Sequence, residues 1–209
     1  MPANKLAPKA KNALVQDPLQ ELLTRTAAYP QYNELAGFLS SRQMMPEIKQ
    51  EYLGTHRGEF TYNNPVFGEP NFPAAGRLSL NYNAEPSTVV HELTHAADRQ
   101  MSELYFEISD KLRRREKLNP LEKQFLDGYE KISFGESRQK MATQLAPEWA
   151  KEKSEYRASK PELAGFGMGS TIQRNEHYPA PAHVDPTMAT EFSIMLDLAQ
   201  RAQAKTGKK

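Results

Sequence analysis

The sequence predicts an α+β fold that is predominantly helical, with a small sheet placed before a long helix. Across most of the chain, apolar residues recur at the three- and four-residue spacing of amphipathic helices. One stretch, RLSLNYNA at 77–84, alternates instead, with Leu78, Leu80 and Tyr82 on one face and polar residues on the other. A chain of 209 residues can bury a substantial core, so a single domain is expected.

The N-terminal residues are set apart by their composition. Residues 1–17 are rich in Lys, Ala and Pro and are predicted to be a disordered tail, which leaves 18–209 as one domain. Charge is balanced over the whole chain, with 27 basic and 26 acidic residues and a formal net charge of +1. This balance gives no drive towards nucleic acid or an anionic membrane, so neither is expected as a partner.

Cysteine is absent from the chain. Disulfides, thiolate zinc clusters and cysteine nucleophiles are therefore excluded, and any metal must be bound by His, Asp or Glu. No apolar run has the length of a signal peptide or of a membrane span. We therefore expect a soluble protein without a signal peptide, cytoplasmic by default, with delivery elsewhere left open. The oligomeric state does not follow from the sequence.

A helical region is predicted from a start signal at Asp17 and Pro18 to about residue 53. Pro30 and Pro46 divide this region into two or three short helices. Residues 54–76 are rich in Gly, Pro, Asn and aromatic residues, which indicates turns and short extended pieces before the strand.

The longest predicted helix runs from Ser87 to about Lys117. Pro86 suits its first turn, and the pair Asn119–Pro120 interrupts it. Further elements are then expected in this order: a short helix ending near Gly128, a helix over 136–157 interrupted at Pro147, a Gly/Pro-rich loop over 161–186, and an amphipathic helix from Thr187.

The long helix carries the sequence HELTH, in which His91 and His95 lie four residues apart. On an α-helix this spacing leaves the two side chains about 40° apart on one face, so both imidazoles can reach one ion. Glu92 is rotated by about 100° from His91 and can reach a water molecule bound to that ion. The motif therefore predicts a site for one zinc ion, with Glu92 as the base that takes a proton from the water.

A tetrahedral catalytic zinc needs a third protein ligand and keeps its fourth position for water. Asp98 continues the same line along the helix, so we interpret it as an acceptor that orients a ligand histidine or as a solvated partner of Arg99. The third ligand is then expected from a later segment. The candidates are Glu136, Glu191 and, from a loop, His183.

HELTHAADR, followed by ISFGESR, resembles the zinc peptidase light chains of the clostridial neurotoxins. In that family an HELxHAxxR helix precedes an SFxExR segment whose glutamate is the third ligand, which implies Glu136 for this role. Anthrax lethal factor is similar in having a tyrosine seven residues before that glutamate, which implies Tyr129 as a hydrogen-bond donor to the oxyanion. The resemblance covers Val89 to Gln139 and implies a zincin-like fold. No counterpart of the neurotoxins' substrate-contact segments is present, so their targets are not implied.

The expected function is that of a zinc-dependent endopeptidase acting on a protein or peptide substrate. If the strand Arg77–Ala84 is an edge strand above the zinc helix, it can pair with an extended peptide and hold the scissile bond near the ion. The alternative is a non-catalytic binding or structural protein in which zinc stabilises a helical scaffold. In that case, the loop 161–186 and the last helix would form the partner surface.

Overall fold

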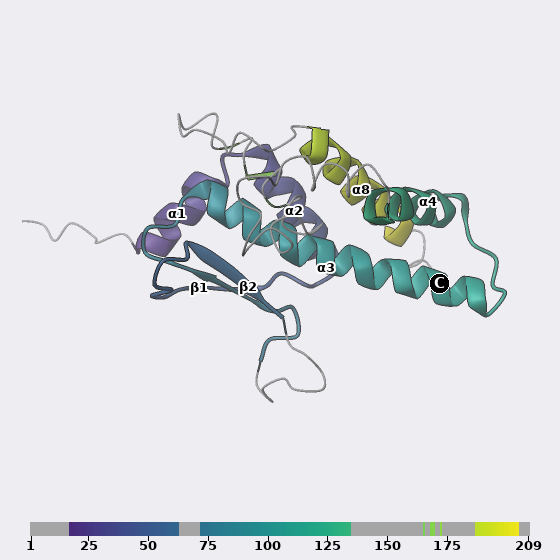
Figure 1. Cartoon of the computed structure of the whole chain (residues 1–209), viewed down its shortest axis with the longest axis horizontal. Coiled ribbons are helices and arrows are strands. Elements are labelled where there is room, and N and C mark those ends of the chain that lie inside the picture. Colours follow the sequence, from purple (N-terminus) through teal and green to yellow (C-terminus); the bar gives the residue numbers. More distant parts are fainter. Residues whose placement is uncertain are drawn as a thin grey trace, which may run out of the picture.

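A long helix, α3 (Pro86–Arg113), runs through the whole protein and organises the other elements around it (Figure 1). The computed structural model describes residues 17–62, 72–134, 165, 168–169, 172 and 187–204. A three-stranded sheet lies against one side of α3, and helices lie on the other side and beside its start (Figure 1). These helices are α1 (Pro18–Thr26), α2 (Pro30–Ser41), α4 (Pro120–Phe134) and α8 (Thr187–Ala204). The predicted α+β class with a helical majority is thus confirmed.

The first two helices begin where prolines suit them. The side chain of Asp17 accepts a hydrogen bond from the N–H of Leu19 at 3.1 Å, and Pro18 occupies the first helical turn of α1. This confirms the start signal that the sequence predicts. Pro30 likewise stands at the start of α2, so it both ends the preceding segment and begins the next helix.

The sheet has the order β1-β3-β2, with β1 (Glu47–Gln50) parallel and β2 (Gly58–Thr61) antiparallel to the central β3 (Arg77–Leu80). Two expectations were wrong here. The segment that forms β1 was predicted to be helical, and the third strand was predicted to be an edge strand. Strand β2, from the turn-rich segment, is the edge that contacts α3.

Long-range contacts explain why β1 escaped prediction. Pro46 removes a helical hydrogen-bond donor immediately before the strand, and Ile48 then pairs with Leu78 of β3. Arg77 Nε donates to Glu47 Oε2 at 3.0 Å across the same pair of strands. The paired residues of β1 and β3 are about thirty residues apart in the sequence, so the local pattern of apolar residues cannot reveal their pairing.

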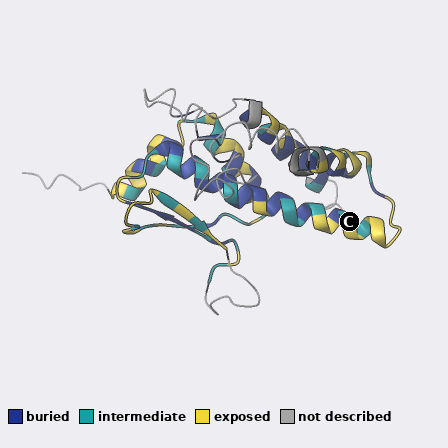
Figure 2. Ribbon diagram, in the orientation of Figure 1, coloured by how far each residue is buried: buried dark blue, intermediate teal, exposed yellow. Residues whose placement is uncertain are grey.

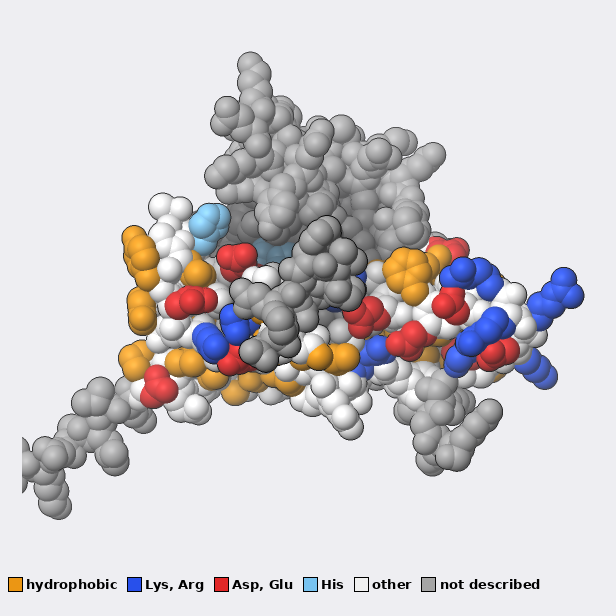
Figure 3. Space-filling view, turned by 90° about the horizontal axis from the view of Figure 1, so that it is seen from below, with side chains coloured by type: hydrophobic (Ala, Val, Ile, Leu, Met, Phe, Trp, Pro, Cys, Tyr) orange, Lys and Arg blue, Asp and Glu red, His pale blue; other side chains and the backbone are white. Residues whose placement is uncertain are grey.

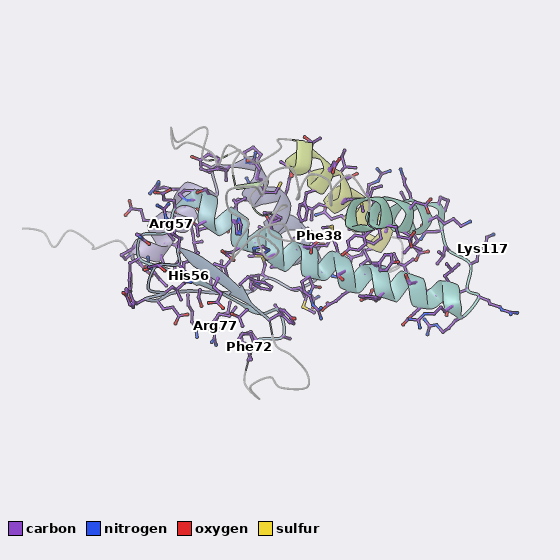
Figure 4. All side chains as sticks on the ribbon, viewed as in Figure 1. Phe38, His56, Arg57, Phe72, Arg77 and Lys117 are labelled. Atoms are coloured by element: carbon purple, nitrogen blue, oxygen red, sulfur yellow. The ribbon has the colours of Figure 1, made fainter. Side chains whose placement is uncertain are left out.

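Arginine side chains hold the two described ends of the connection between β2 and β3. The guanidinium of Arg99 lies 4.9 Å from the ring centre of Tyr62, and that of Arg77 lies 4.8 Å from the ring centre of Phe72. Figure 4 shows Phe72 and Arg77 next to each other below the sheet. The first contact ties the end of β2 to α3, and the second ties the approach of β3 to that strand.

Helix α3 is buried over its first half and exposed towards its far end (Figure 2). The apolar residues expected to bury the HELTH segment do so, since each is at most 2% exposed: Val89, Val90, Leu93, Ala96 and Ala97. The helix begins at Pro86, close to the predicted start, and ends at Arg113, four residues before the predicted end.

Helices α2 and α3 end in the same backbone arrangement. The second residue after each helix has a positive φ, 57° at Gln43 and 60° at Arg115. The next N–H then donates to the carbonyl five residues earlier, at 2.8 Å from Met44 and 3.0 Å from Glu116. This is the Schellman arrangement, in which glycine is the usual residue at the positive φ.

Helix α4 continues beyond Gly128, where the sequence predicted its end. The glycine instead allows a close approach of α8, because a Cβ at this position would lie 2.9 Å from the sulfur of Met195. At the other end of α4, the side chain of Asn119 accepts hydrogen bonds from the N–H groups of Leu121 and Glu122, at 2.9 and 3.0 Å. Glu122 in turn accepts from the N–H of Asn119 at 2.8 Å, which completes a capping box.

The turn between α3 and α4 is rich in charged residues, and acidic and basic side chains interleave there (Figure 3). Lys111 Nζ lies 2.7 Å from Glu122 Oε1, and Arg114 Nε lies 3.1 Å from Glu116 Oε1. These ion pairs offset two of the positive charges in this turn.

Part of the predicted loop 161–186 is helical and buried. Residues 165, 168, 169 and 172 are in helical conformation, and Met168 and Ile172 are fully buried in the core. Their spacing of three, four and seven residues places them on one helix face. The predicted helix over 136–157 lies outside the described residues. Within the described part, no helix is long and apolar enough to cross a membrane.

Candidate metal centre

The imidazoles of His91 and His95 converge on one point beside α3. Their Nε2 atoms lie 3.0 Å apart, and their rings meet edge to face at 85° with centres 4.7 Å apart. Both side chains are partly exposed, whereas the three residues between them are buried. The one open stripe on this part of α3 therefore carries the two histidines.

The donor pair fits a zinc ion. Two imidazole nitrogens bound to one tetrahedral zinc at about 2.0–2.1 Å lie about 3.4 Å apart, close to the separation of the Nε2 atoms. Without an ion, the same separation allows one Nε2–H to donate a hydrogen bond to the other Nε2. A metal would replace that shared proton, so a site of this kind binds metal less well as the histidines become protonated.

Glu92 is buried beneath the edge strand. The residue is only 7% exposed, and Gly58 of β2 lies directly against its side chain. A Cβ at Gly58 would lie 2.9 Å from Cγ and 3.1 Å from Oε1 of Glu92, and 2.7 Å from Cγ2 of Thr88. The end of β2 that contains Gly58 therefore packs onto the carboxylate next to the histidine pair.

A second close approach occurs at His91. A Cβ at Gly165 would lie 2.9 Å from both Cε1 and Nδ1 of His91 and 3.1 Å from Nε2. Gly169, on the same helical face, approaches the backbone of α3 instead, because its Cβ would lie 3.0 Å from the carbonyl oxygen of Ser87. Gly165 thus packs directly on the imidazole of His91.

The predicted third ligand lies outside the described residues, because Glu136 and His183 both belong to segments that the structure does not describe. Its rival Glu191 lies exposed in the first part of α8. Within the described ranges, no group of three His, Asp or Glu side chains is arranged to hold one ion. The role of Glu136 stays a prediction, and the described part of the site consists of His91, Glu92 and His95.

Asp98 is buried on α3, one turn beyond His95. The interpretation of Asp98 as a solvated partner of Arg99 is therefore wrong. Arg99 points elsewhere, with Nε 3.0 Å from Glu103 Oε1 and its guanidinium over the ring of Tyr62. A role for Asp98 in orienting a ligand histidine stays a prediction.

Tyr129 packs against Phe125 on its own helix, α4, and against Tyr105 in the second half of α3. Its ring stacks on Phe125 with centres 5.6 Å apart and lies 5.1 Å from the ring of Tyr105. Tyr105 follows His95 by ten residues, which is about 15 Å along a helix axis. The described contacts thus bring Tyr129 to Tyr105 rather than to the histidine pair, and its predicted action on an oxyanion gains no support from them.

Gly58 and Gly165 are the residues of this site that sequence patterns did not single out. A signal for Gly58 would have required its strand to be predicted first, because a glycine in a strand often marks a close backbone approach. For Gly165 the signal was its four-residue spacing from Gly169, which places both on one face of a helix. Neither signal names the side chain that would be approached.

Comparisons with protein families, curated proteins and solved structures found no match to this chain. The chemistry of the site must therefore be argued from its own residues.

Proposed function

We propose that this protein is a zinc-dependent endopeptidase in which His91 and His95 bind the ion and Glu92 acts as the general base. The observation that carries the proposal is the convergence of the two Nε2 atoms, 3.0 Å apart, beside a buried carboxylate from the next helical position. Glu136 is the proposed third ligand, from the resemblance of ISFGESR to the corresponding neurotoxin segment.

When bound, zinc would polarise the substrate carbonyl and lower the pKa of its water molecule towards neutrality. Glu92 then accepts a proton from the attacking water and carries it to the leaving amine. Burial suits this task, because a carboxylate shielded from bulk water holds its proton in place between the two transfers. A cation beside Glu92 also offsets the cost of burying its negative charge.

Strand β2 is suited to bind the substrate backbone. Among the described strands it pairs with β3 alone, so its other edge can hydrogen-bond to an extended peptide. Its first residue, Gly58, lies against Glu92, so a peptide paired with β2 would pass close to the base. This arrangement favours a peptide over a compact small molecule as the substrate.

The non-catalytic alternative predicts a different site. A structural zinc is enclosed by four protein ligands, whereas a catalytic zinc keeps an open position. The partial exposure of His91 and His95 favours the open arrangement. A buried glutamate next to the pair also has an evident task in hydrolysis and none in a closed structural site.

The test is the variant Glu92→Gln, which keeps the shape of the side chain but cannot accept the proton. Zinc content should match that of the wild type, while the rate of peptide hydrolysis should fall by about 10²- to 10⁴-fold. New termini generated in a mixture of unfolded proteins would report hydrolysis whichever sequence the enzyme prefers to cleave.

Glu103→Gln is the matched control, because Glu103 lies on the same helix and forms an exposed ion pair with Arg99. It should leave both zinc content and hydrolysis unchanged. Equal hydrolysis by wild type and Glu92→Gln would eliminate the proposed mechanism. Stoichiometric zinc without any hydrolysis in the wild type would support the structural alternative.

A further inference from the structure

We propose that Gly58 and Gly165 are positioning residues, the first for the base Glu92 and the second for the ligand His91. This inference rests on the proposed function and adds to it a division of labour between two segments. Gly58 of β2 positions the base, and Gly165 positions a metal ligand. Each glycine acts through the side chain it contacts.

The contact at Gly165 is with the half of the imidazole that carries the metal-binding nitrogen. The three ring atoms nearest to a Cβ at this position are Cε1, Nδ1 and Nε2 of His91, at 2.9, 2.9 and 3.1 Å. Non-bonded carbon atoms favour separations of about 3.5–4.0 Å, so an added methyl group must push the ring away. Such a displacement would move Nε2 of His91 out of its position opposite Nε2 of His95.

The contact at Gly58 is with the stem of the base. A Cβ there would meet Cγ of Glu92 at 2.9 Å and Cγ2 of Thr88 at 2.7 Å. Both atoms belong to α3, which is fixed in the core by its buried apolar face. The added methyl group would therefore move the carboxylate of Glu92 or separate β2 from α3. Its contacts do not include an imidazole, so the two histidines should keep their positions.

Two alanine variants separate these roles. Gly165→Ala should weaken zinc binding by about 10- to 100-fold, with turnover largely restored when zinc is saturating. Gly58→Ala should leave zinc affinity within about threefold of the wild type but lower kcat by about 10²-fold, because the base is misplaced. Zinc affinity is measured by competition with a chromophoric chelator, and kcat is measured at saturating zinc.

Two further glycines are the matched controls. A Cβ at Gly37 would meet only Gln200 Nε2, at an ordinary 3.8 Å, so Gly37→Ala should change neither zinc affinity nor kcat. Gly169→Ala presses on the carbonyl of Ser87, so it should lower thermal stability without a selective loss of zinc affinity. Alanine also favours helix over glycine, so helix propensity cannot explain a loss in Gly165→Ala.

Double variants keep the inference testable if a single substitution unfolds the protein. Gly165→Ala should lower the unfolding temperature of the metal-free protein, because its methyl group presses on the His91 ring. In a His91→Ala background the ring is absent, so this decrease should disappear. Thr88→Ser removes the methyl group that lies nearest to a Cβ at Gly58. The double variant Gly58→Ala/Thr88→Ser should therefore fold, while the contact of the added methyl group with Glu92 remains. An equal loss of stability from Gly165→Ala with and without the His91 ring would overturn the role assigned to Gly165.

The failure of this inference differs from a failure of the proposed function. Wild-type zinc affinity in Gly165→Ala, or parallel losses of affinity and kcat in both variants, would overturn the inference while peptidase activity stands. A wild type that binds zinc but cleaves no peptide would overturn the proposed function. In that event, a selective loss of zinc affinity in Gly165→Ala would still support the role of Gly165.

Discussion

Glu92 and the two histidines show how one turn of helix can separate two kinds of environment. His91 and His95 lie on the open stripe of α3, whereas Glu92 is rotated into the contact between α3 and β2. The histidines are thus accessible to an ion, and the carboxylate is shielded at the edge of the same site. The helical rotation of about 100° per residue is sufficient to produce this difference.

Tyr129 gives a prediction at the scale of one atom. The ring of Tyr129 packs on Phe125 and Tyr105, so Tyr129→Phe should keep this packing and lower kcat by less than about threefold. Loss of the hydroxyl interaction should lower the free energy of unfolding by about 1 kcal/mol. The measurement is steady-state hydrolysis by the folded variant. A decrease in kcat of about 10²-fold or more would instead restore its predicted role at the oxyanion.

At the residue scale, helical periodicity was enough to predict which side chains share a site when they share a helix. The convergence of His91 and His95 follows from their spacing alone. The third ligand does not, because it depends on how a distant segment returns to α3. The roles of Gly58 and Gly165 could not be predicted for the same reason, because each depends on a contact with a side chain that is distant in the sequence.

Among the elements, β1 and β3 are joined by a titratable ion pair between Glu47 and Arg77. Hydrogen bonds from Lys49 and then from Arg77 hold the pKa of the Glu47 carboxyl below its ordinary value. The stabilisation from this carboxylate is therefore fully present above the ordinary pKa of a glutamate and is lost as the pH falls through the lowered value.

This linkage predicts how Glu47→Gln depends on pH. The variant should be less stable than the wild type at neutral pH, and the two should converge in stability as the pH falls below the ordinary pKa of a glutamate and through the lowered pKa of Glu47. Urea unfolding at a series of pH values measures the difference. A gap in stability that stays constant down to low pH would contradict the assigned contribution of this ion pair.

The ends of α2 and α3 give a second prediction for the elements. Gln43 and Arg115 hold positive φ angles that cost a residue with a side chain about 1–2 kcal/mol, whereas glycine adopts them freely. Gln43→Gly and Arg115→Gly should therefore each stabilise the protein by about 0.5–1 kcal/mol, as measured by chemical denaturation. Glycine at Glu107, an exposed position inside α3, is the control and should destabilise by about 1 kcal/mol.

The elements were predictable to the extent that their contacts are local. Helices α1, α2, α3 and α8 carry their own periodicity and start signals, and the structure confirms them. The segment of β1 lacked such a signal, because a strand of four residues is specified by its neighbour. The extension of α4 past Gly128 was missed because that glycine serves the contact with Met195 and not a helix end.

At the scale of the whole molecule, α3 joins the proposed metal site to the core. It contacts the sheet on one side and α1, α2, α4 and α8 elsewhere. The core beside it includes Phe38 of α2, which is fully buried (Figure 4). An ion that binds only the folded state therefore stabilises the folded state as a whole.

Zinc binding should accordingly raise the unfolding temperature. At a free zinc concentration of about 100 times Kd, the stabilisation is about 2.7 kcal/mol, or about 5–10 °C for a domain of this size. A chelator should reverse the shift and abolish hydrolysis, and added zinc should restore both. Thermal unfolding of His95→Ala with and without zinc is the control, and a shift of equal size in that variant would place the ion elsewhere.

The arginine contacts at Tyr62 and Phe72 have a consequence for how this protein could diversify. Each end of the segment between them is anchored separately, one to α3 and one to the central strand β3. Insertions or exchanges between these anchors would thus leave the pairing of the strands and the position of the base untouched. Selection could then change the sequence of this segment while the paired strands and the proposed base Glu92 are inherited unchanged.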